Sequence, residues 1–541
     1  MKKHPEIEWL QRKWNLPASA ESVVLDLLEA ERRGSTACEI QAEVSDWGGA
    51  AGPSNATTPL VLVKHDGKQY LQSRRLHRAE RDIATRILQM AGNITGANVV
   101  EADISQLFPT ANKDDLQANV ARVAVSRQLT IITGGPGTGK TYTLARILAL
   151  LVAAGIPVNG IRLAAPTGKA ADRMKTAISD SLEGLPVEFK KHQDFLVRIA
   201  ESSSTLHKLL GYNPQQKRCQ FDAQKPLPCK VLIVDECSMI DALLWRALLQ
   251  ALPSDARVIL LGDPNQLESV GQGNVFAELA RIACWSGSKL GPAHVHLTEA
   301  RRFRERPDIL AFAQALEKSD AAATVELLGK VPGDSAPNGL GWLPSSGTAL
   351  PCSDFPKPIL EALEKVARAA TPQEALNNLG NVCILTAQRE YFVGSKAMSS
   401  AIEKHFSAQT GVRNQPIIIN RNDPETGLRN GTVGVIHAAD DGTRRAWFHS
   451  GDGNLRAIAI AKLPDFSPAW AITIHRSQGS EYEAVMVILP RQESPMATRE
   501  LLYTAITRAR LSVYVAGELE AVHKAAETPS NRRTILASFF S

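Results

Sequence analysis

Short apolar runs alternate with helix-like periodicity along most of the chain from about residue 109 onward. An apolar, β-branched run without polar alternation is typical of a strand buried on both faces of a sheet. Strands that alternate with helices predict parallel sheets covered by those helices. The pattern occurs on both sides of a Pro-, Gly- and Ser-rich stretch at 331–358, which we expect to be a loop or linker, so it predicts two α/β units. The clearest runs are Val231–Val234, Val258–Leu261, Val382–Thr386, Ala484–Leu489 and Leu511–Ala516.

Two regions depart from this alternation. Near the N-terminus, Leu60–Val63 and Gln69–Leu71 flank an Asp-Gly pair, which is a strong hairpin signal. A helical pattern at Leu76–Met90 follows. Further on, short β runs separated by Asn-Gly and Asp-Gly turns predict an all-β insertion. We therefore predict a small α+β N-terminal domain at 1–108, a first α/β domain at 109–290, a second at 291–541, and the insertion at 412–466 within the second.

The first α/β unit contains the segment GGPGTGKT between an apolar strand pattern and a helical one. This order of strand, glycine-rich loop and helix is the context that a phosphate-binding loop requires. Its backbone N–H groups and the helix dipole attract an anion. Lys140 adds a positive charge for the terminal phosphates, and Thr141 offers a hydroxyl to Mg²⁺. The predicted triphosphate site consists of Gly134, Gly135, Pro136, Gly137, Thr138, Gly139, Lys140 and Thr141.

Two carboxylates, Asp235 and Glu236, follow directly after the buried run Val231–Val234. In a chain without a phosphate loop, two acidic residues at this position would be an ordinary strand end. Beside a phosphate loop in the same sheet, Asp235 is expected to bind Mg²⁺ and Glu236 to activate water. Gln266 follows the next buried run, and its amide can hydrogen-bond the terminal phosphate, although Asp-Pro-Asn standing alone would favour a plain turn.

Composition excludes several classes of protein. The chain has 541 residues, too many for one core, and its net charge of +5 does not by itself indicate nucleic acid. No apolar run approaches the roughly 20 residues of a membrane span. The N-terminus lacks the apolar core of a signal peptide. The 7 cysteines are scattered without a C-x-x-C pair, which favours reduced thiols and a cytoplasmic protein over a zinc or iron–sulfur site.

The arrangement of these motifs suggests a motor. Four arginines within Arg301–Arg306 are either a solvated face or, beside an ATP site, a source of charge for phosphoryl transfer. With the phosphate loop and carboxylates on the first unit and arginines on the second, ATP would draw the units together and hydrolysis would release them. Nucleic acid would then be held through its phosphates by side chains such as Lys169, His207 and His475.

The motifs GGPGTGKT, APTGKAA, STLHKLLG, VDECSMID, LGDPNQLESV, EARRFR, TIHRSQGSEY and LLYTAITRAR occur in the order found in superfamily-one helicases. The chain most closely resembles the RecD family, the alpha subunits of exodeoxyribonuclease V. The resemblance covers most of the chain and is weakest at 1–58 and 320–380. It implies two RecA-like P-loop domains, with the all-β insertion as an SH3-like module and the N-terminal domain as a docking module.

The resemblance also implies roles for individual residues. Gln117 matches the glutamine that reads adenine, and Glu481 matches an acidic residue near the ribose. Lys140, Thr141, Asp235, Glu236 and Gln266 match the phosphate lysine, the two Mg²⁺ ligands, the catalytic base and the phosphate sensor. Arg302 and Arg508 match arginines that reach the γ-phosphate from the second domain. Pro166, Thr167, His207, Thr473 and His475 match positions along the single-strand path. Arg476 stands where relatives often have lysine, which puts only the contact geometry in doubt.

The implied activity is ATP-dependent 5′-to-3′ translocation on single-stranded DNA, within a RecBCD-type heterotrimer that processes duplex DNA ends in recombinational repair. RecB-like and RecC-like subunits would be the partners, and the N-terminal domain would dock on the RecC-like one. Residues 212–228 are expected to form a small strand-separating hairpin. The nuclease would belong to another subunit, in agreement with the absence of an acid-x-Lys pattern after Pro307-Asp308.

Two alternatives remain open from the sequence. One is a stand-alone RecD-like helicase, although such relatives usually carry a longer N-terminal region with helix–hairpin–helix character, which 1–108 do not show. The other is an ATP-gated DNA clamp or regulatory subunit that does not translocate. A clamp and a motor share the same site, but the presence of all the hydrolytic residues favours the motor.

Overall fold

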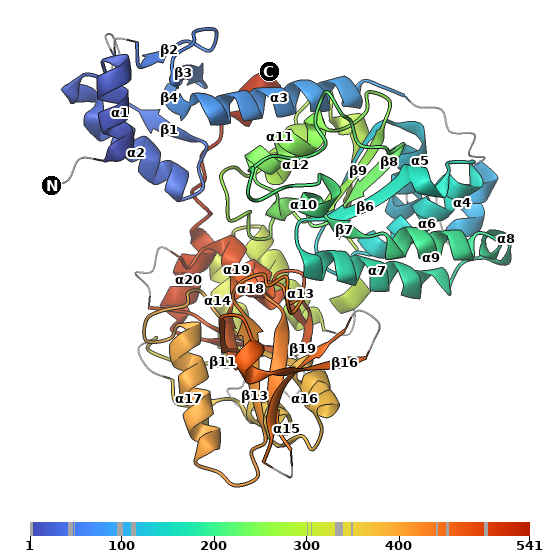
Figure 1. Ribbon diagram of the computed structural model, residues 1–541, viewed down its shortest axis with the longest axis vertical. Helices are drawn as coiled ribbons and strands as arrows, with labels where there is room; N and C mark the ends of the chain where they lie inside the picture. The colour runs from blue at the N-terminus through green and yellow to red at the C-terminus, as the bar shows by residue number, and fades with distance from the viewer. Residues whose placement is uncertain are drawn as a thin grey trace. The chain divides into compact units, whose positions relative to one another are not determined.

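The structure is a computed structural model. It describes residues 4–41, 47, 49–94, 101–109, 115–299, 301–303, 306–330, 339–347, 350–439, 442–450, 454–491 and 496–540. The chain forms two compact units (Figure 1). Unit 1 comprises Met1–Pro264, Glu268–Glu299 and Asn531–Ser541, and unit 2 comprises Asn265–Leu267 and Ala300–Ser530. Ala300 and Arg304 of the predicted arginine motif, and 440–441 and 451–453 of the predicted insertion, lie outside the described residues.

Unit 1 begins with a small α+β domain. Helices α1 (Pro5–Trp14) and α2 (Glu21–Arg32) pack with a 4-stranded sheet in the order β1-β4-β3-β2. The predicted hairpin is confirmed, because β3 and β4 pair antiparallel around Asp66 and Gly67, whose φ angles are 47° and 72°. Positive φ at both central residues is the backbone of a tight hairpin turn. The strands are β1 (Ala37–Ile40), β2 (Ala51–Gly52), β3 (Leu60–His65) and β4 (Lys68–Ser73).

The rest of unit 1 is built on a 6-stranded parallel sheet with the order β10-β5-β9-β8-β6-β7. Successive residues of β5 face opposite cores: Ile131 packs on one side of the sheet and Ile132 on the other. The strands are β5 (Leu129–Gly134), β6 (Ile161–Ala165), β7 (Ser204–Thr205), β8 (Val231–Val234), β9 (Arg257–Gly262) and β10 (His294–Leu297).

Helices cover both faces of this sheet. One core contains side chains of α3 (Arg74–Ala91), α11 (Ala242–Gln250), α12 (Val275–Ala283) and the 3₁₀ helix η8 (Leu536–Phe539). The other contains α4 (Glu101–Leu107), α5 (Leu116–Ser126), α6 (Lys140–Ala153), α7 (Gly168–Leu182), α8 (Val187–Lys190) and α9 (Gln193–Glu201). The short helix α10 (Leu206–Leu209) follows β7.

The cores divide the chain differently from the predicted boundaries. Helix α3 lies within the predicted N-terminal domain, yet its Ile83 and Ile87 share a core with Ile131 of the parallel sheet. Strand β10 lies beyond the predicted end at 290 and pairs with β5. The segment Asn531–Ser541, predicted as the end of the second domain, groups with unit 1. Figure 1 shows the C-terminus beside α3, which contacts η8.

Unit 2 contains a 5-stranded parallel sheet with the order β11-β20-β19-β12-β18. Its strands are β11 (Gly339–Leu343), β12 (Val382–Thr386), β18 (Ala471–Thr473), β19 (Tyr482–Ile488) and β20 (Ala509–Ala516). Its helices are α13 (Pro307–Glu317), α14 (Ala321–Gly329), α15 (Lys357–Arg368), α16 (Pro372–Leu379), α17 (Ser395–Ser407), α18 (Ile474–Ser477), α19 (Arg499–Ile506) and α20 (Leu519–Glu527). The prediction of a loop throughout 331–358 is wrong at β11. Gly341 suggested a loop, but a Cβ at this position would overlap the Tyr514 ring of β20, so the strand itself requires the glycine.

The all-β insertion is a second 5-stranded sheet of unit 2, antiparallel throughout, with the order β16-β15-β14-β13-β17. Ile417, Ile436 and Phe448 lie in its small core. The strands are β13 (Asn414–Ile419), β14 (Val433–Ala438), β15 (Arg444–His449), β16 (Leu455–Ala459) and β17 (Phe466–Pro468). Two parallel sheets with helices and one antiparallel sheet confirm the predicted fold class. By contrast, residues 212–228 show one isolated bridge, between Asn213 and Arg218, rather than a hairpin of two strands.

None of the helices in the described ranges is long and apolar enough to cross a membrane.

Candidate active site

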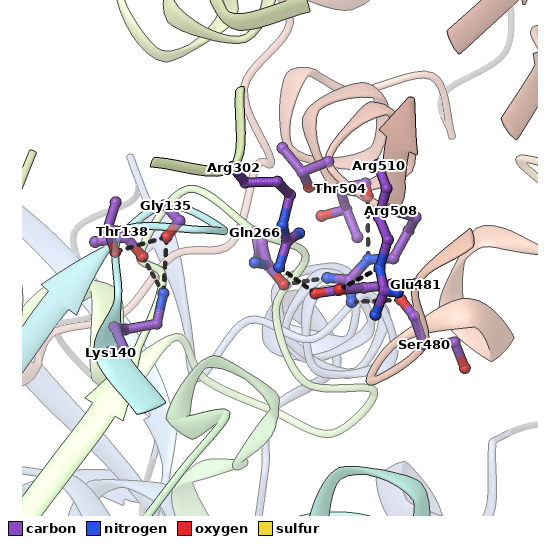
Figure 2. Close-up of polar contacts among 12 residues, drawn as sticks. Gly135, Thr138, Lys140, Gln266, Arg302, Ser480, Glu481, Thr504, Arg508 and Arg510 are labelled. Atoms are coloured by element: carbon purple, nitrogen blue, oxygen red, sulfur yellow. Dashed lines mark hydrogen bonds and ion pairs between the residues drawn. The ribbon is translucent and has the colours of Figure 1, made fainter. Parts of the chain in front are cut away.

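The phosphate loop is fully formed between β5 and α6. Lys140 is the first residue of α6, and its Nζ donates a hydrogen bond to the carbonyl of Gly134 (2.5 Å). It donates a second to the carbonyl of Gly135 (3.0 Å), which Figure 2 shows. The Thr138 hydroxyl donates to the carbonyl of Gly135 at 2.9 Å. The ammonium group thus lies in the concave side of the loop, where a phosphate would compete with these carbonyls for it.

Glycine is required in this loop at two positions with positive φ, Gly137 at 77° and Gly139 at 85°. Gly139 also lies against Gln117, because a Cβ on Gly139 would overlap Gln117 Nε2. Gln117 follows the N-cap residue Asp115, which accepts its backbone N–H at 2.8 Å. Its side chain is buried and donates to the carbonyl of Thr138 at 3.4 Å. The structure therefore brings the predicted adenine-reading glutamine against the phosphate loop.

The two carboxylates lie at the end of β8. Asp235 donates its N–H to the carbonyl of Ala164 in the neighbouring strand (3.0 Å), and its Oδ1 accepts the N–H of Glu236 (2.8 Å). Glu236 has φ 52°, an uncommon conformation for a residue with a side chain and a form of strain typical of functional sites. Burial, and next the charge of Glu236, raise the pKa of Asp235 to about 6. The positive charge of Lys140 opposes this shift, so the lysine and the carboxylates act on one another in one site.

Side chains predicted to contact DNA from unit 1 follow β6 and β7, which pair in parallel and so end at the same edge of the sheet. Pro166 and Thr167 follow β6, and the Thr167 hydroxyl accepts the N–H of Ala170 as the N-cap of α7, whose first turn contains Lys169. His207, on α10 after β7, is exposed, and its ring meets Tyr212 edge-on at 5.4 Å between centroids. Tyr212 was not predicted as a DNA contact, although a tyrosine soon after the Thr-Leu-His motif is a usable sequence signal.

In unit 2, Arg508 is joined to Gln266. Arg508 is only 2 % exposed, and its Nη2 donates to Gln266 Oε1 (Figure 2). Its other nitrogens donate to the carbonyls of Thr504 (3.3 Å) and Ser480 (3.4 Å). The Thr504 hydroxyl accepts the N–H of Leu267 at 2.7 Å. The short segment Asn265–Leu267, which contains the predicted phosphate sensor, is thus fastened within unit 2 beside a predicted γ-phosphate arginine.

Two further arginines of unit 2 bind the carboxylate of Glu481. Arg302 Nη2 lies 2.5 Å from Glu481 Oε1, and Arg510 Nε lies 3.1 Å from Glu481 Oε2 (Figure 2). The Glu481 side chain is 7 % exposed. The resemblance implied separate roles at the γ-phosphate and the ribose for Arg302 and Glu481, but the structure pairs them with each other. Arg510 was not selected from the sequence, although it is the next arginine in the motif that contains Arg508.

Thr473 and His475 lie at the end of β18 and in the short helix α18. The adjacent Arg476 donates to Asn420 Oδ1 at 3.0 Å. Burial, and next the charge of Arg389, lower the pKa of Arg476. Arg389 follows β12, which pairs with β18, so cationic groups gather where these two strands end. Arg389 could not be predicted from the sequence, because no neighbouring residue signals that it lies near Arg476.

Known family models match a part of each unit. A family model described as an AAA domain matches residues 117–272, and one described as the UvrD-like helicase C-terminal domain matches 468–516. RecBCD enzyme subunit RecD of Mycolicibacterium smegmatis is 34% identical over 445 residues, 80% of this chain and 76% of the relative. The RecD subunit of Mycobacterium tuberculosis is 32% identical over 532 residues, 96% and 88% of the two chains. The chain belongs to the RecD family.

A third relative is similar over a smaller part of its own length. The ATP-dependent RecD2 DNA helicase of Deinococcus radiodurans is 30% identical over 414 residues, 75% of this chain but 49% of the relative. Membership of the RecD family, together with the AAA-domain match, makes the chain a nucleotide-binding DNA helicase with ATPase activity.

Proposed function

We propose that the chain is an ATP-driven 5′-to-3′ translocase on single-stranded DNA and a subunit of a RecBCD-type helicase–nuclease acting on duplex DNA ends. The observation that carries this proposal is geometric: Lys140 is held by the carbonyls of the phosphate loop after β5, and Asp235 and Glu236 follow β8 of the same parallel sheet. A protein that only clamped DNA could bind ATP without Glu236. The complete set favours repeated hydrolysis, which a motor needs.

In this proposal each polar group has one task. Lys140 leaves the carbonyls of Gly134 and Gly135 for the phosphates of ATP, and Glu236 accepts the proton of the attacking water. Thr141 and Asp235 would hold Mg²⁺ through the oxygen ligands that this ion prefers, and the ion would neutralise charge on the phosphates. The remaining proposed roles are adenine contact for Gln117, ribose contact for Glu481, phosphate sensing for Gln266, and transition-state charge for Arg302 and Arg508.

The pair formed by Arg302 and Glu481 adds a step to this scheme. For Arg302 to reach a phosphate and Glu481 to reach a ribose, the contact between these two residues must break, and each residue must bind ATP instead. Arg510 then stays as a cation for Glu481, so the buried carboxylate is not left without a partner when Arg302 moves. We infer that Arg510 lowers the free-energy cost of separating Arg302 from Glu481.

The extent of similarity within this chain supports the assembly. The M. tuberculosis RecD subunit is similar over 96% of this chain and the RecD2 helicase over 75% of it, which favours a RecBCD subunit over a stand-alone helicase. RecB-like and RecC-like chains are the proposed partners, with the nuclease on another subunit. The N-terminal domain is the proposed docking module, and Trp9 and Leu25 give its helices exposed apolar surface (48% and 43% exposed).

The deciding experiment is to purify the chain alone and with RecB-like and RecC-like subunits of the same source. Translocation is then measured on single strands labelled at the 5′ or the 3′ end. We expect movement toward the 3′ end that is lost in a complex carrying Lys140→Gln in this chain alone, because a partner motor would keep its own activity. Movement toward the 3′ end that persists in that complex, or movement of the isolated chain toward the 5′ end only, would contradict the assignment.

A further prediction concerns DNA contacts. Thr167→Ala and His475→Ala are expected to weaken single-strand binding to the same extent for every base sequence, because phosphates carry no sequence information. Lys169→Met should also reduce the slope of log affinity against log salt by about 0.7, the value for one released counterion. Fluorescence anisotropy at several salt concentrations measures both effects. His523→Ala, an exposed histidine on α20, is the control. A slope unchanged by Lys169→Met would remove Lys169 from the path.

A further inference from the structure

Arg532, in the segment that returns to unit 1 after unit 2, holds the loop 268–274. Its Nε lies 3.1 Å from Glu268 Oε2, and its Nη1 donates to the carbonyls of Gly271 (2.7 Å) and Gly273 (3.4 Å). The ion pair is largely buried, with the Arg532 and Glu268 side chains 14% and 7% exposed. One guanidinium therefore binds three acceptors of a single loop, a pattern that a lysine ammonium cannot reproduce in the same plane.

The same guanidinium also lies against the N-terminal domain at Gly34. Gly34 has φ 92°, and a Cβ there would overlap the guanidinium of Arg532. The carbonyl of Gly34 accepts the N–H of Gly273 at 2.8 Å. Arg532 thus lies between a glycine of the N-terminal domain and the loop, and three segments distant in sequence meet at one side chain.

The loop that Arg532 holds continues directly from the proposed phosphate sensor. Glu268 is the second residue after Gln266, and its other oxygen accepts Asn274 Nδ2 at 2.9 Å. Farther along, Gln272 accepts the N–H of Ala242 at 2.8 Å. The end of the loop away from Gln266 therefore has backbone support of its own. At the end next to Gln266, the chain passes from the contacts of Gln266 and Leu267 within unit 2 to the buried carboxylate of Glu268, which is its side-chain anchor within unit 1 and is paired with Arg532.

We propose that Arg532 is a positioning residue for ATP hydrolysis, which it serves by fixing Glu268 and through it the course of the chain at Gln266. The inference rests on the proposed role of Gln266 as phosphate sensor. Because Gly34 packs on the same guanidinium, a partner that shifts the N-terminal domain would also shift this anchor. The expected signature is a loss of turnover with little loss of nucleotide affinity, since Arg532 supports the sensor and does not contact the phosphate loop through any of these bonds.

The test compares Arg532→Met with Arg533→Met in the full chain. Arg533 is the adjacent arginine, paired with Glu39 at 2.6 Å and 46% exposed, so its loss removes a surface ion pair only. Arg532→Met is expected to lower kcat for DNA-stimulated ATP hydrolysis on the order of 10- to 100-fold, the range that a small displacement of a catalytic group causes. Affinity for a fluorescent ATP analogue should stay at the parent value. Arg533→Met should match the parent in both measurements.

A purely structural role is separated from a positioning role by kcat of a double variant. Arg532→Met leaves the buried Glu268 carboxylate without the Arg532 cation, so under either role its Tm should fall. Adding Glu268→Gln removes that charge and should recover the Tm. We expect kcat of the double variant to remain low, and Arg532→Lys, which keeps the charge without the planar fork, to be intermediate. Recovery of kcat together with Tm, or parent kcat in Arg532→Met below its Tm, would overturn the proposal. Parent turnover in Gln266→Ala would instead remove the sensor role on which it rests.

Discussion

A Glu236→Gln variant is expected to bind ATP and DNA but to hydrolyse ATP about 10²- to 10⁴-fold more slowly than the parent chain, the range attributed to a positioned general base. Glutamine has the shape of glutamate and keeps the backbone at φ 52° under the same constraints, but its amide cannot accept the proton of the attacking water. Steady-state hydrolysis with saturating single-stranded DNA measures the rate, and analogue binding measures affinity.

Lys140→Gln provides the matching control for this site. Its side chain lies among the carbonyls of the phosphate loop, so its loss should reduce both nucleotide affinity and turnover, whereas Glu236→Gln should reduce turnover alone. The pair of variants separates binding from chemistry. Near-parent turnover in Glu236→Gln would show that another group activates the water, and the proposed active site would have to be abandoned.

An Arg508→Ala variant should retain nucleotide binding and lose on the order of 10³- to 10⁵-fold in kcat, as expected for an arginine that stabilises the transition state of phosphoryl transfer. This range corresponds to roughly 4–7 kcal/mol of barrier. Arg508 is nearly fully buried and its guanidinium binds Gln266, so both its charge and its planar fork are in use. Arg508→Lys should therefore recover only part of the loss.

Because Arg508 is buried, its removal can also destabilise unit 2. Thermal unfolding of each variant should accompany the kinetics, and rates should be compared well below the lowest Tm. Arg508→Lys keeps a cation near Gln266, so a structural defect would be milder there while the loss of the fork would remain. A variant that hydrolyses ATP at the parent rate once bound, and differs only in nucleotide affinity, would show that Arg508 binds ATP without stabilising the transition state.

Features with local causes could be predicted from the sequence. The Asp66-Gly67 hairpin depends on two residues that tolerate positive φ, and the phosphate loop depends on a strand, glycines and a helix in sequence. The buried run Val231–Val234 is fully apolar, and it delivers Asp235 and Glu236 at the edge where strand ends gather. In each case neighbouring residues determine the conformation, so patterns a few residues long are sufficient.

Features that depend on distant neighbours could not be predicted. Gly341 looked like a loop residue, since the need for a glycine comes from the Tyr514 ring on another strand. The pairing of Arg302 with Glu481 joins residues 179 positions apart, and each carried a separate implied role. Arg532 gave no signal at all, because an arginine in a polar C-terminal segment is usually solvated and its three acceptors lie more than 250 positions away.

The return of the C-terminal segment to unit 1 has a consequence for synthesis on the ribosome. Leu536 and Ala537 of η8 belong to the same core as Ile83 of α3 and Phe276 of α12. That core stays incomplete until residue 537 has left the ribosome, by which time all of unit 2 has been made. Domains usually fold in the order in which they are translated. The unit whose synthesis starts first therefore completes this core last, and part of its apolar surface stays uncovered while unit 2 is translated.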